Sequence, residues 1–510
     1  MRMFAAGFLL AASAAGAELP CAGCHPSEVT AFQSSPKGRS LGAASIFTEG
    51  QVAHKLSDSV LTVARHGDVL QHRVERHGVS AEYPVAYSVG AGIVGYSYIV
   101  RIGRYLFQSP LSYYTQTKRW DLTPGYESDA HLDFTHQISG GCLFCHAGSV
   151  NTIAGAANQF GDPAFTPISC ERCHGPVEAH LRQPARGNIV NPARLAARER
   201  DSVCEQCHLE GNIRILGPGR DWWDFRVGQA TESTWVVYLG AADRGGLRAV
   251  SQSELLAESK CARQSGGRLW CGTCHNPHAS GTDRAAAVRK ICLSCHEDLF
   301  ESGGHAEAAE CVSCHMPRLR PDNVPHAAVT DHSIPRRPRA RIAGLGGSQP
   351  DLKAWREPDE AWTQRDLGLA YFERATSSHS VSDLRRAYEI LSKLAAEQRT
   401  DAPVEADLAA MLLQMNEPQL AIPLFSAAAR QQPGNARYAY VLGAALGRTG
   451  KIDDAIRELK RAIQLDPSQM DPYLEMAELY KRTGRKADSR SVLEEYLRFM
   501  PQNLEVRLLN

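Results

Sequence analysis

Seven copies of the pattern Cys-x-x-Cys-His lie in the first 315 residues, and they constrain the fold more than any other feature of the chain. Each copy is a signature for covalent attachment of c-type haem, in which two thiols bond the porphyrin and the histidine binds the iron. We therefore expect seven covalently attached haem c groups, with these histidines as proximal iron ligands. The copies are Cys21/Cys24/His25, Cys142/Cys145/His146, Cys170/Cys173/His174, Cys204/Cys207/His208, Cys271/Cys274/His275, Cys292/Cys295/His296 and Cys311/Cys314/His315.

Zinc binding and disulfides explain the pattern less well than haem does. A zinc site needs four cysteines, or two cysteines with two histidines, from paired motifs. Neither zinc nor a disulfide explains why histidine follows the second cysteine every time. Fourteen of the fifteen cysteines belong to the motifs, and Cys261 is left over. For Cys261 we favour a buried inert thiol; the alternatives are an axial or redox-active sulfur, an exposed thiol and an intermolecular disulfide.

The first residues have the features of a signal peptide. Arg2 supplies a positive charge, residues 4–15 are apolar, and Ala15-Gly16-Ala17 fits the small-x-small cleavage pattern. We expect a signal peptide over residues 1–17, cleaved after about Ala17, and a periplasmic or otherwise exported protein. No second apolar run reaches the ~18 residues of a membrane span. Lys+Arg and Asp+Glu both number 56, which gives no indication of nucleic-acid binding.

The identity of the sixth iron ligand sets the redox behaviour of a haem. After the signal peptide, the region of the motifs contains one methionine, Met316, directly beside His315, but eleven spare histidines. We therefore expect mostly bis-histidine haems of low potential. His66, His72 and His77 fall on predicted hairpins, where a surface position is more common than a role as iron ligand. His136 is the next candidate for a distal ligand. The favoured distal ligands are His54, His131, His180, His278, His305, His326 and His332.

Composition and spacing divide the chain into three zones. Residues 18–340 carry all the motifs, and residues 341–360 are rich in glycine and polar residues, as expected of a linker. Residues 58–116 alternate apolar and polar positions and predict a small β-hairpin insert. The rest of the first zone has short Gly/Pro-rich spacings that leave little room for a protein core, so we expect sparse secondary structure with haems packed against one another. The expected fold class is mainly α.

The third zone, residues 361–510, contains an internal repeat. Pro433, Pro467 and Pro501 are 34 residues apart. Similar residue types fill equivalent positions before each proline, as in the tetratricopeptide repeat, which has two antiparallel helices per unit. We expect an α-solenoid of about four helix pairs. The equivalent positions are Leu408/Ala409, Leu442/Gly443 and Met476/Ala477; Leu412, Leu446 and Tyr480; Ala421, Ala455 and Ser489; and Phe425, Leu459 and Leu493.

Short sequences around the motifs carry a resemblance to a known superfamily. CHGPVEAH, CHNPH and CHMP followed by TDHSIP resemble the soluble tetrahaem cytochromes of nitrifying bacteria and the haem core of hydroxylamine oxidoreductase. The whole chain resembles exported multihaem cytochromes with C-terminal tetratricopeptide repeats. The resemblance implies that His180 and His278 ligate neighbouring haems. Pro36 and Lys37 depart from the superfamily, whose members carry His or Met near this position, so the first haem has either a different ligand or an open site.

Two functions remain open. Electron transfer along closely packed, mostly bis-histidine haems is favoured, because ligand-saturated irons need no substrate. The alternative is an oxidoreductase that acts on a small nitrogen or sulfur compound at one open haem. The expected partners are redox proteins, either other cytochromes or a quinol-linked complex, together with a protein bound by the repeats.

Overall fold

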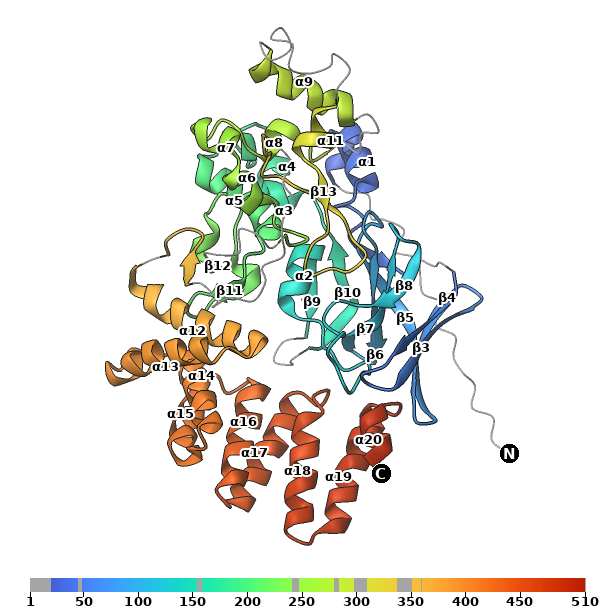
Figure 1. Ribbon diagram of the computed structural model, residues 1–510, viewed down its shortest axis with the longest axis vertical. Helices are drawn as coiled ribbons and strands as arrows, with labels where there is room; N and C mark the ends of the chain where they lie inside the picture. The colour runs from blue at the N-terminus through green and yellow to red at the C-terminus, as the bar shows by residue number, and fades with distance from the viewer. Residues whose placement is uncertain are drawn as a thin grey trace.

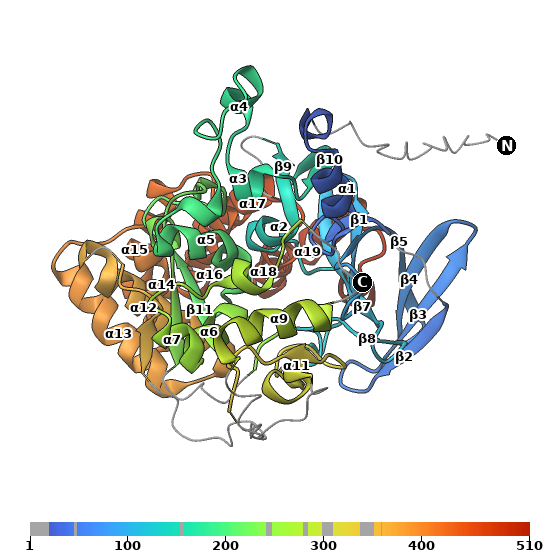
Figure 2. The same ribbon diagram turned by 90° about the horizontal axis from the view of Figure 1, so that it is seen from above.

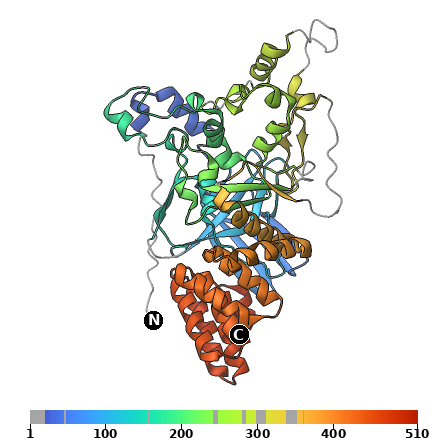
Figure 3. The same cartoon turned by 90° about the vertical axis from the view of Figure 1, so that its left-hand side faces the viewer.

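The computed structural model describes residues 20–44, 48–153, 158–240, 247–278, 284–297, 310–336, 351–358 and 360–509. The predicted signal peptide, His305 and the first part of the predicted linker lie outside these ranges. The described chain is arranged in three layers (Figures 1 and 3), with most of the Cys-x-x-Cys-His motifs at one end, a sheet in the middle and the helical repeat at the other end.

The middle layer is an antiparallel eight-stranded sheet with the order β2-β3-β4-β5-β6-β7-β8, and β1 pairs with β5. Turns that need positive φ fix its hairpins. For example, His77 and Gly78 join β4 to β5 with φ of 50° and 76°, a combination typical of a two-residue hairpin turn. The strands are β1 (Leu41–Ala43), β2 (Gly50–His54), β3 (Ser59–His66), β4 (Val69–Arg76), β5 (Val79–Val89), β6 (Tyr96–Ile102), β7 (Tyr105–Tyr114) and β8 (Arg119–Leu122).

The sheet curls until its first and last strands meet. A Cβ added to Gly50 on β2 would lie 2.3 Å from Cδ1 of Trp120 on β8, so only glycine permits this close approach. The indole N–H of Trp120 donates to the carbonyl of Thr48 at 2.8 Å. Alternate side chains such as Leu61, Val63 and Val74 point into the enclosed core and are almost fully buried.

The prediction of a small hairpin insert over about 58–116 was therefore too modest. Hairpins do form there, but the sheet extends from Leu41 to Leu122 and is a major layer of the molecule. Strands β1, β2 and β8 contain 3, 5 and 4 residues, which is too short for alternation to stand out in the sequence. The expectation of mainly sparse structure before the repeat is corrected accordingly.

The motif region consists of short helices and small sheets. β11 and β12 pair with β15, which lies inside the predicted linker. The helices are α1 (Pro26–Ser34), α2 (Gly140–His146), α3 (Glu171–His174), α4 (Glu178–Arg182), α5 (Ala197–His208), α6 (Gln252–Glu258), α7 (Lys260–Gln264), α8 (Cys271–Cys274), α9 (Arg284–His296) and α11 (Cys311–His315). The strands are β9 (Ala147–Thr152), β10 (Phe160–Pro167), β11 (Ile213–Leu216), β12 (Trp235–Gly240), β13 (Arg318–Leu319), β14 (Val329–Thr330) and β15 (Leu352–Ala354).

The C-terminal layer confirms the predicted helical repeat. Gly443 on α16 shows why its position takes small residues, because an added Cβ would lie 2.8 Å from Cγ of Leu459 on α17. Phe425, Leu459 and Leu493 fill equivalent buried positions on α15, α17 and α19. The helices are α12 (Glu360–Ser378), α13 (Val381–Ala396), α14 (Ala402–Gln414), α15 (Pro418–Gln431), α16 (Ala436–Arg448), α17 (Ile452–Leu465), α18 (Asp471–Arg482), α19 (Lys486–Phe499) and α20 (Leu504–Leu509).

Both ends of the repeat are attached to the rest of the chain. At its start, the Arg365 guanidinium on α12 donates to the carbonyl of Leu216 on β11 at 2.9 Å. At its end, α20 packs on β5 (Figure 1), and the buried carboxylate of Asp133 accepts from the Asn503 amide at 3.0 Å and the Leu504 N–H at 2.7 Å. The repeat is thus an arch bound at both ends.

Replacing Asp133 with alanine should loosen the attached end of the arch. The change leaves the Leu504 N–H and the Asn503 amide without their buried acceptor, at a cost of about 1–3 kcal/mol. We expect faster amide hydrogen exchange over residues 500–509 and a lower free energy of unfolding. Glu75→Ala, which removes an exposed ion pair with Arg73, should change neither, and equal exchange in the two variants would refute this role of Asp133.

Candidate haem sites

Each motif lies on one turn of helix, which explains its spacing. The amide N–H of the histidine donates to the carbonyl of the first cysteine at 2.8 Å for His25, 2.9 Å for His174 and 2.9 Å for His275. Residues i and i+3 lie on the same face of a helical turn, so the two thiols can reach one porphyrin edge while the imidazole projects beside them. All fifteen cysteines are free thiols in the structure, as thioether formation requires.

Four of the motif cysteines are exposed, which differs from the enclosed setting expected of a sulfur that holds a large apolar ring. They are Cys24, Cys142, Cys295 and Cys314, whereas the other motif cysteines are partly buried. Two of the four lie at short elements with little packing of their own. Cys24 follows the single turn η1 (Pro20–Gly23) and Cys314 lies on α11, and neither element has a buried residue. Protein side chains alone therefore do not enclose these four sulfurs, and haem attachment at them stays a prediction from the motif.

Three proximal histidines face a second imidazole. The ring centroids are 6.5 Å apart for His25 and His180, 5.8 Å apart for His174 and His278, and 6.2 Å apart for His275 and His332. Rings in contact would lie closer, whereas two metal–nitrogen bonds of roughly 2 Å each, plus about 1 Å from each nitrogen to its ring centre, add up to about 6 Å. These spacings fit one iron between each pair of rings.

The helix that supplies one of these distal histidines lies beside the first motif. His180 is on α4, which extends on a long loop away from the main body in Figure 2. Figure 3 shows the green segment of α4 next to the blue helix α1, at the upper left. The first motif therefore obtains its facing imidazole from a segment far away in the sequence.

Hydrogen bonds orient several of these rings through Nδ1. The Nδ1 atoms of His174, His180, His315 and His332 lie 2.8, 3.1, 2.9 and 2.9 Å from the backbone carbonyls of Val190, Ala185, Pro335 and Thr330. A ring that donates from Nδ1 presents the lone pair of Nε2 to a metal, a common arrangement around ligating histidines. These carbonyls could not be found from the sequence, because a backbone carbonyl leaves no residue-type signal.

Burial keeps the candidate ligands neutral. It lowers the pKa of His208 to about 4 and lowers the pKa values of His146, His278 and His332 below their usual range. These rings are uncharged near pH 7, which is the form of histidine that binds a metal. The donor set, its orientation and its protonation state all fit haem iron.

Thiols from different motifs also lie against each other. Cys207 Sγ is 3.8 Å from the carbonyl of Cys145, and Cys145 Sγ is 3.7 Å from the carbonyl of Gln206. Together with burial, Cys21 raises the pKa of Cys170, Cys271 raises that of Cys204, and Cys311 raises that of Cys292, so the two side chains of each pair lie near each other. Porphyrins attached at such neighbouring sulfurs would approach one another at their edges.

Three of the predicted distal ligands do not face a proximal histidine ring and contact other groups. Both ring nitrogens of His54 are engaged in the sheet region, with Ser57 Oγ at 2.7 Å and the Glu127 carbonyl at 3.3 Å. Nε2 of His326 lies 2.7 Å from a carboxylate oxygen of Asp121, and His131 is exposed. The structure brings none of these three against a proximal ring, and His305 lies outside the described residues. Sequence position suggested the three histidines, but their partners come from strands and loops distant in the chain.

The histidines that were given less weight also lie in the sheet region. His66 and His77 are exposed, whereas His72 is fully buried, with Nδ1 2.7 Å from Ser109 Oγ. His136 stacks on Tyr126 with ring centroids 4.1 Å apart. Cys261 is partly buried on α7, near Cys274 and Cys292. This position lies between the fourth and fifth motifs in the chain and leaves the roles considered for this thiol open.

Removing one facing imidazole should expose one iron. We expect His278→Ala to convert the haem held by His174 from low spin to high spin, because that iron loses its strong-field sixth ligand. The measurement is electron paramagnetic resonance of the oxidised protein, with the gain in carbon monoxide bound per chain after reduction. His66→Ala, in an exposed position on β3, should change neither signal, and an unchanged spectrum for His278→Ala would contradict the pairing.

Three stretches of the chain match known protein families. Residues 113–175 match the family described as cytochrome c554 and c-prime, residues 263–301 match the doubled CXXCH motif, and residues 443–484 match the TPR repeat. Four of the seven motifs lie inside the first two matches. No curated protein matches the chain.

Several solved structures are similar to part of the chain. MamA is 21% identical over 29% of this chain and 83% of its own, with a TM-score of 0.26. YrrB, described as a TPR protein with an unusual peptide-binding site, is 16% identical over 29% of this chain and 74% of its own, with a TM-score of 0.26. MamA from Desulfovibrio magneticus RS-1 is 16% identical over 28% of this chain and 84% of its own, with a TM-score of 0.24. The family matches and the motifs together identify covalently bound haem c, and the chain is a multihaem c-type cytochrome with tetratricopeptide repeats.

Proposed function

We propose that this protein transfers electrons along seven covalently bound haems, most of them ligated by two histidines, and that it belongs to the superfamily of nitrifier tetrahaem cytochromes and hydroxylamine oxidoreductase. The observation that carries the proposal is the set of three facing imidazole pairs at 5.8–6.5 Å. Bound haem supplies one-electron redox chemistry, and the residues of the chain fix its ligands and spacing. Two imidazoles on one iron leave no position for a substrate, which suits a carrier.

Contacts between thiols support an order for the haems. Taking the motifs in sequence order, the neighbouring side chains of Cys21 and Cys170 link the first to the third, and Cys173 lies near Cys204 between the third and the fourth. From the fourth, the contacts lead to the fifth, sixth and seventh through Cys271, Cys274, Cys292 and Cys311. The second motif contacts the fourth through Cys145 and Cys207. The proposed path is therefore 1-3-4-5-6-7, with the second haem as a side branch.

The order predicts different consequences for the loss of two different haems. Cys271→Ala with Cys274→Ala removes the fifth haem and should interrupt transfer between the first four haems and the last two. Cys142→Ala with Cys145→Ala removes the second haem and should leave the main path intact. Rapid-mixing spectroscopy with a reductant confined to one end would show slow, incomplete reduction only for the first double variant. Each variant must still contain six haems per chain, and equal kinetics in both would refute the branched order.

Export is part of the proposal. The predicted signal peptide and the attachment of c-type haem outside the cytoplasm both support a periplasmic or otherwise exported protein. None of the helices within the described residues is long and apolar enough to cross a membrane. We propose that other cytochromes or a quinol-linked complex deliver or accept the electrons.

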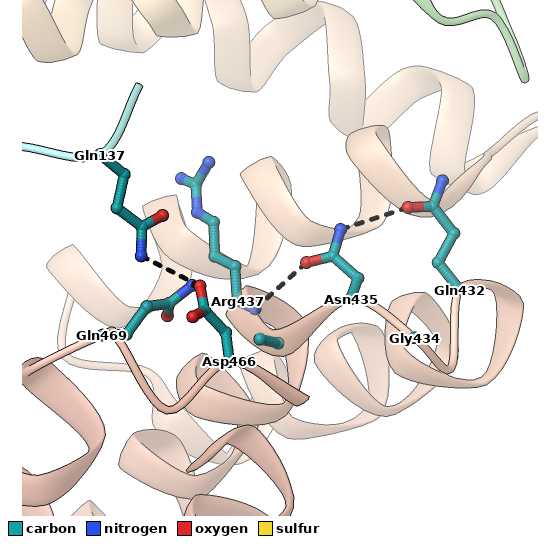
Figure 4. Close-up of a pocket in the computed structure, with 8 residues that line it drawn as sticks. Gln137, Gln432, Gly434, Asn435, Arg437, Asp466 and Gln469 are labelled. Atoms are coloured by element: carbon teal, nitrogen blue, oxygen red, sulfur yellow. Dashed lines mark hydrogen bonds between the residues drawn. The ribbon is translucent and has the colours of Figure 1, made fainter. Parts of the chain in front are cut away.

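The repeats support protein–protein interaction, and a cavity of about 480 Å³ marks where a partner could bind. Figure 4 shows its lining, in which Gln137 from the sheet region lies opposite Asp466 and Gln469, and the Arg437 side chain extends toward the opening. Among the described residues, the Arg437 guanidinium has no hydrogen bond or ion pair. The exposed guanidinium lies near the carboxyls of Asp407 and Glu373, where it opposes the rise in pKa caused by burial. A partner segment that carries a carboxylate could add a charge-assisted hydrogen bond to it.

Reversing the charge of Arg437 should weaken this docking. We expect Arg437→Glu to slow reduction of the cytochrome by membranes of its source bacterium, because like charges repel an acidic partner segment. Haem content and the spectrum should stay unchanged. Arg457→Glu, at an exposed position on α17 paired with Asp454, is the matched control. Equal slowing by both variants would indicate a general charge effect and contradict docking at the cavity.

An oxidoreductase remains a second candidate because of the second motif. Its His146 ring is buried, Nδ1 has no hydrogen-bond partner in the described chain, and none of the three imidazole pairs includes it. An open iron there would bind one carbon monoxide per reduced chain. A wild-type protein that binds none excludes this candidate and leaves the carrier.

A further inference from the structure

The segment of residues 180–198 is strongly basic in a chain whose formal charge is zero. It contains four arginines and no aspartate or glutamate, whereas Lys+Arg and Asp+Glu both number 56 in the whole chain. One of the four, Arg198, forms an ion pair at 3.4 Å. The others, Arg182, Arg186 and Arg194, are exposed, and within the described residues their guanidinium groups have neither a hydrogen bond nor an ion pair. Three charges of one sign therefore face solvent.

Hydrogen bonds fix the loop that follows α4 and carries the first two of these arginines. Nδ1 of His180 lies 3.1 Å from the Ala185 carbonyl, which also accepts from the Asn188 N–H at 3.1 Å. The side-chain amide of Asn188 donates to the carbonyl of Gln183 at 2.9 Å. The arginines are thus presented by a loop of defined shape, and the same loop orients the His180 ring.

The basic segment lies beside the first motif. The His180 ring faces the His25 ring with centroids 6.5 Å apart, and α4 projects from the main body (Figure 2) next to α1 (Figure 3). Cys24 and His25 are themselves exposed. A haem attached at this motif would lie near the surface of the protein, where a redox partner can approach it closely. The first motif is also one end of the proposed path.

We propose that Arg182, Arg186 and Arg194 form a docking surface, the arginine arm, for an acidic redox protein that exchanges one electron with the haem of the first motif. The inference rests on the proposed function and adds a surface distinct from the cavity at Arg437. Exposed charges of one sign attract a partner of the opposite sign and orient it during the encounter. In the exchange one centre is oxidised as the other is reduced, and no bond is made or broken.

The composition of the segment favours a protein partner over an anionic membrane. Leu181 is its single exposed large apolar side chain within the described residues. Attachment to a lipid surface depends on buried apolar area together with clustered positive charge. Three arginines with one leucine supply little of either, whereas a folded partner can bury the polar surface around the charges as well.

Three variants with matched charges test the arginine arm. In the arm variant its three arginines become glutamine, and in the lysine variant they become lysine, which keeps the charge. The control variant removes three exposed arginines of the repeat, by Arg385→Gln, Arg490→Gln and Arg498→Gln. The arm variant and the control variant therefore have the same net charge.

The measurement is the rate at which reduced flavodoxin, an acidic flavin protein, reduces the full-length holoprotein in rapid mixing. At an ionic strength of about 0.01 M, where charges act over roughly 30 Å, we expect the arm variant to react about tenfold more slowly than the wild type. The lysine and control variants should stay within about twofold of the wild type. At about 1 M, where the range falls to roughly 3 Å, all four proteins should react alike.

Four results would overturn the proposal. These are an unchanged rate in the arm variant, equal slowing of the arm and control variants, a lysine variant as slow as the arm variant, and slowing that persists at high ionic strength. An unchanged rate combined with lost sedimentation on vesicles of phosphatidylcholine and phosphatidylglycerol would assign the arm to an anionic membrane.

A second reductant separates failure of the arm from failure of the proposed function. Reduced lumiflavin has no protein surface to dock, so it should reduce the wild type and the arm variant equally. Seven haems per chain that lumiflavin reduces fully, with no effect of the arm variant on the flavodoxin reaction, would count against the arm alone. Haems that accept no electrons from lumiflavin in the wild type would count against the proposed function.

Discussion

The architecture brings imidazole rings from distant parts of the chain into facing pairs, each of which could hold one iron. His25 faces His180, His174 faces His278 and His275 faces His332, so each pair ties together segments that no shared secondary structure connects. The helices α3, α4, α8 and α11, which carry motif cysteines or a distal histidine, have no buried residues of their own. These four helices therefore lack the hydrophobic contacts that hold ordinary helices in place, and on the proposed function metal ligation and porphyrin packing would replace them.

The sheet and the repeat stabilise themselves in the usual way. Their buried side chains form one large hydrophobic cluster that includes Leu61 and Phe107 of the sheet and Phe425 and Tyr496 of the repeat. Because the arch of helices is attached at β11 and again at β5, it forms a frame that does not depend on haem. Short motif segments can then be held against this frame, as at α2, where Leu143 packs in one cluster with Leu41 of β1 and Ile99 of β6.

The sequence was informative where a residue type is required by chemistry or by a fixed period. The motifs and the 34-residue repeat follow from local patterns, and the same patterns singled out His180, His278 and His332, which the structure brings near proximal rings. Strands such as β1 and β8 were missed because their pairing comes from distant segments and their alternation is too short. The surroundings of His54 and His326 were not foreseen for the same reason, since Glu127 and Asp121, which they contact, are remote in sequence. Ligand choice depends on three-dimensional neighbours, so only segments close to a motif could be assigned in advance.

The position of the cavity gives the proposed side branch a physical meaning. Gln137 lines the cavity and precedes Cys142 by only a few residues, with Ser139 capping α2 in between. A partner segment bound at Arg437 would therefore approach the chain close to the second motif, whereas α9 and α11 lie at the far end in Figure 1. On the proposed order, an electron that enters at the second haem reaches the fourth, where the path divides toward the first haem and toward the seventh.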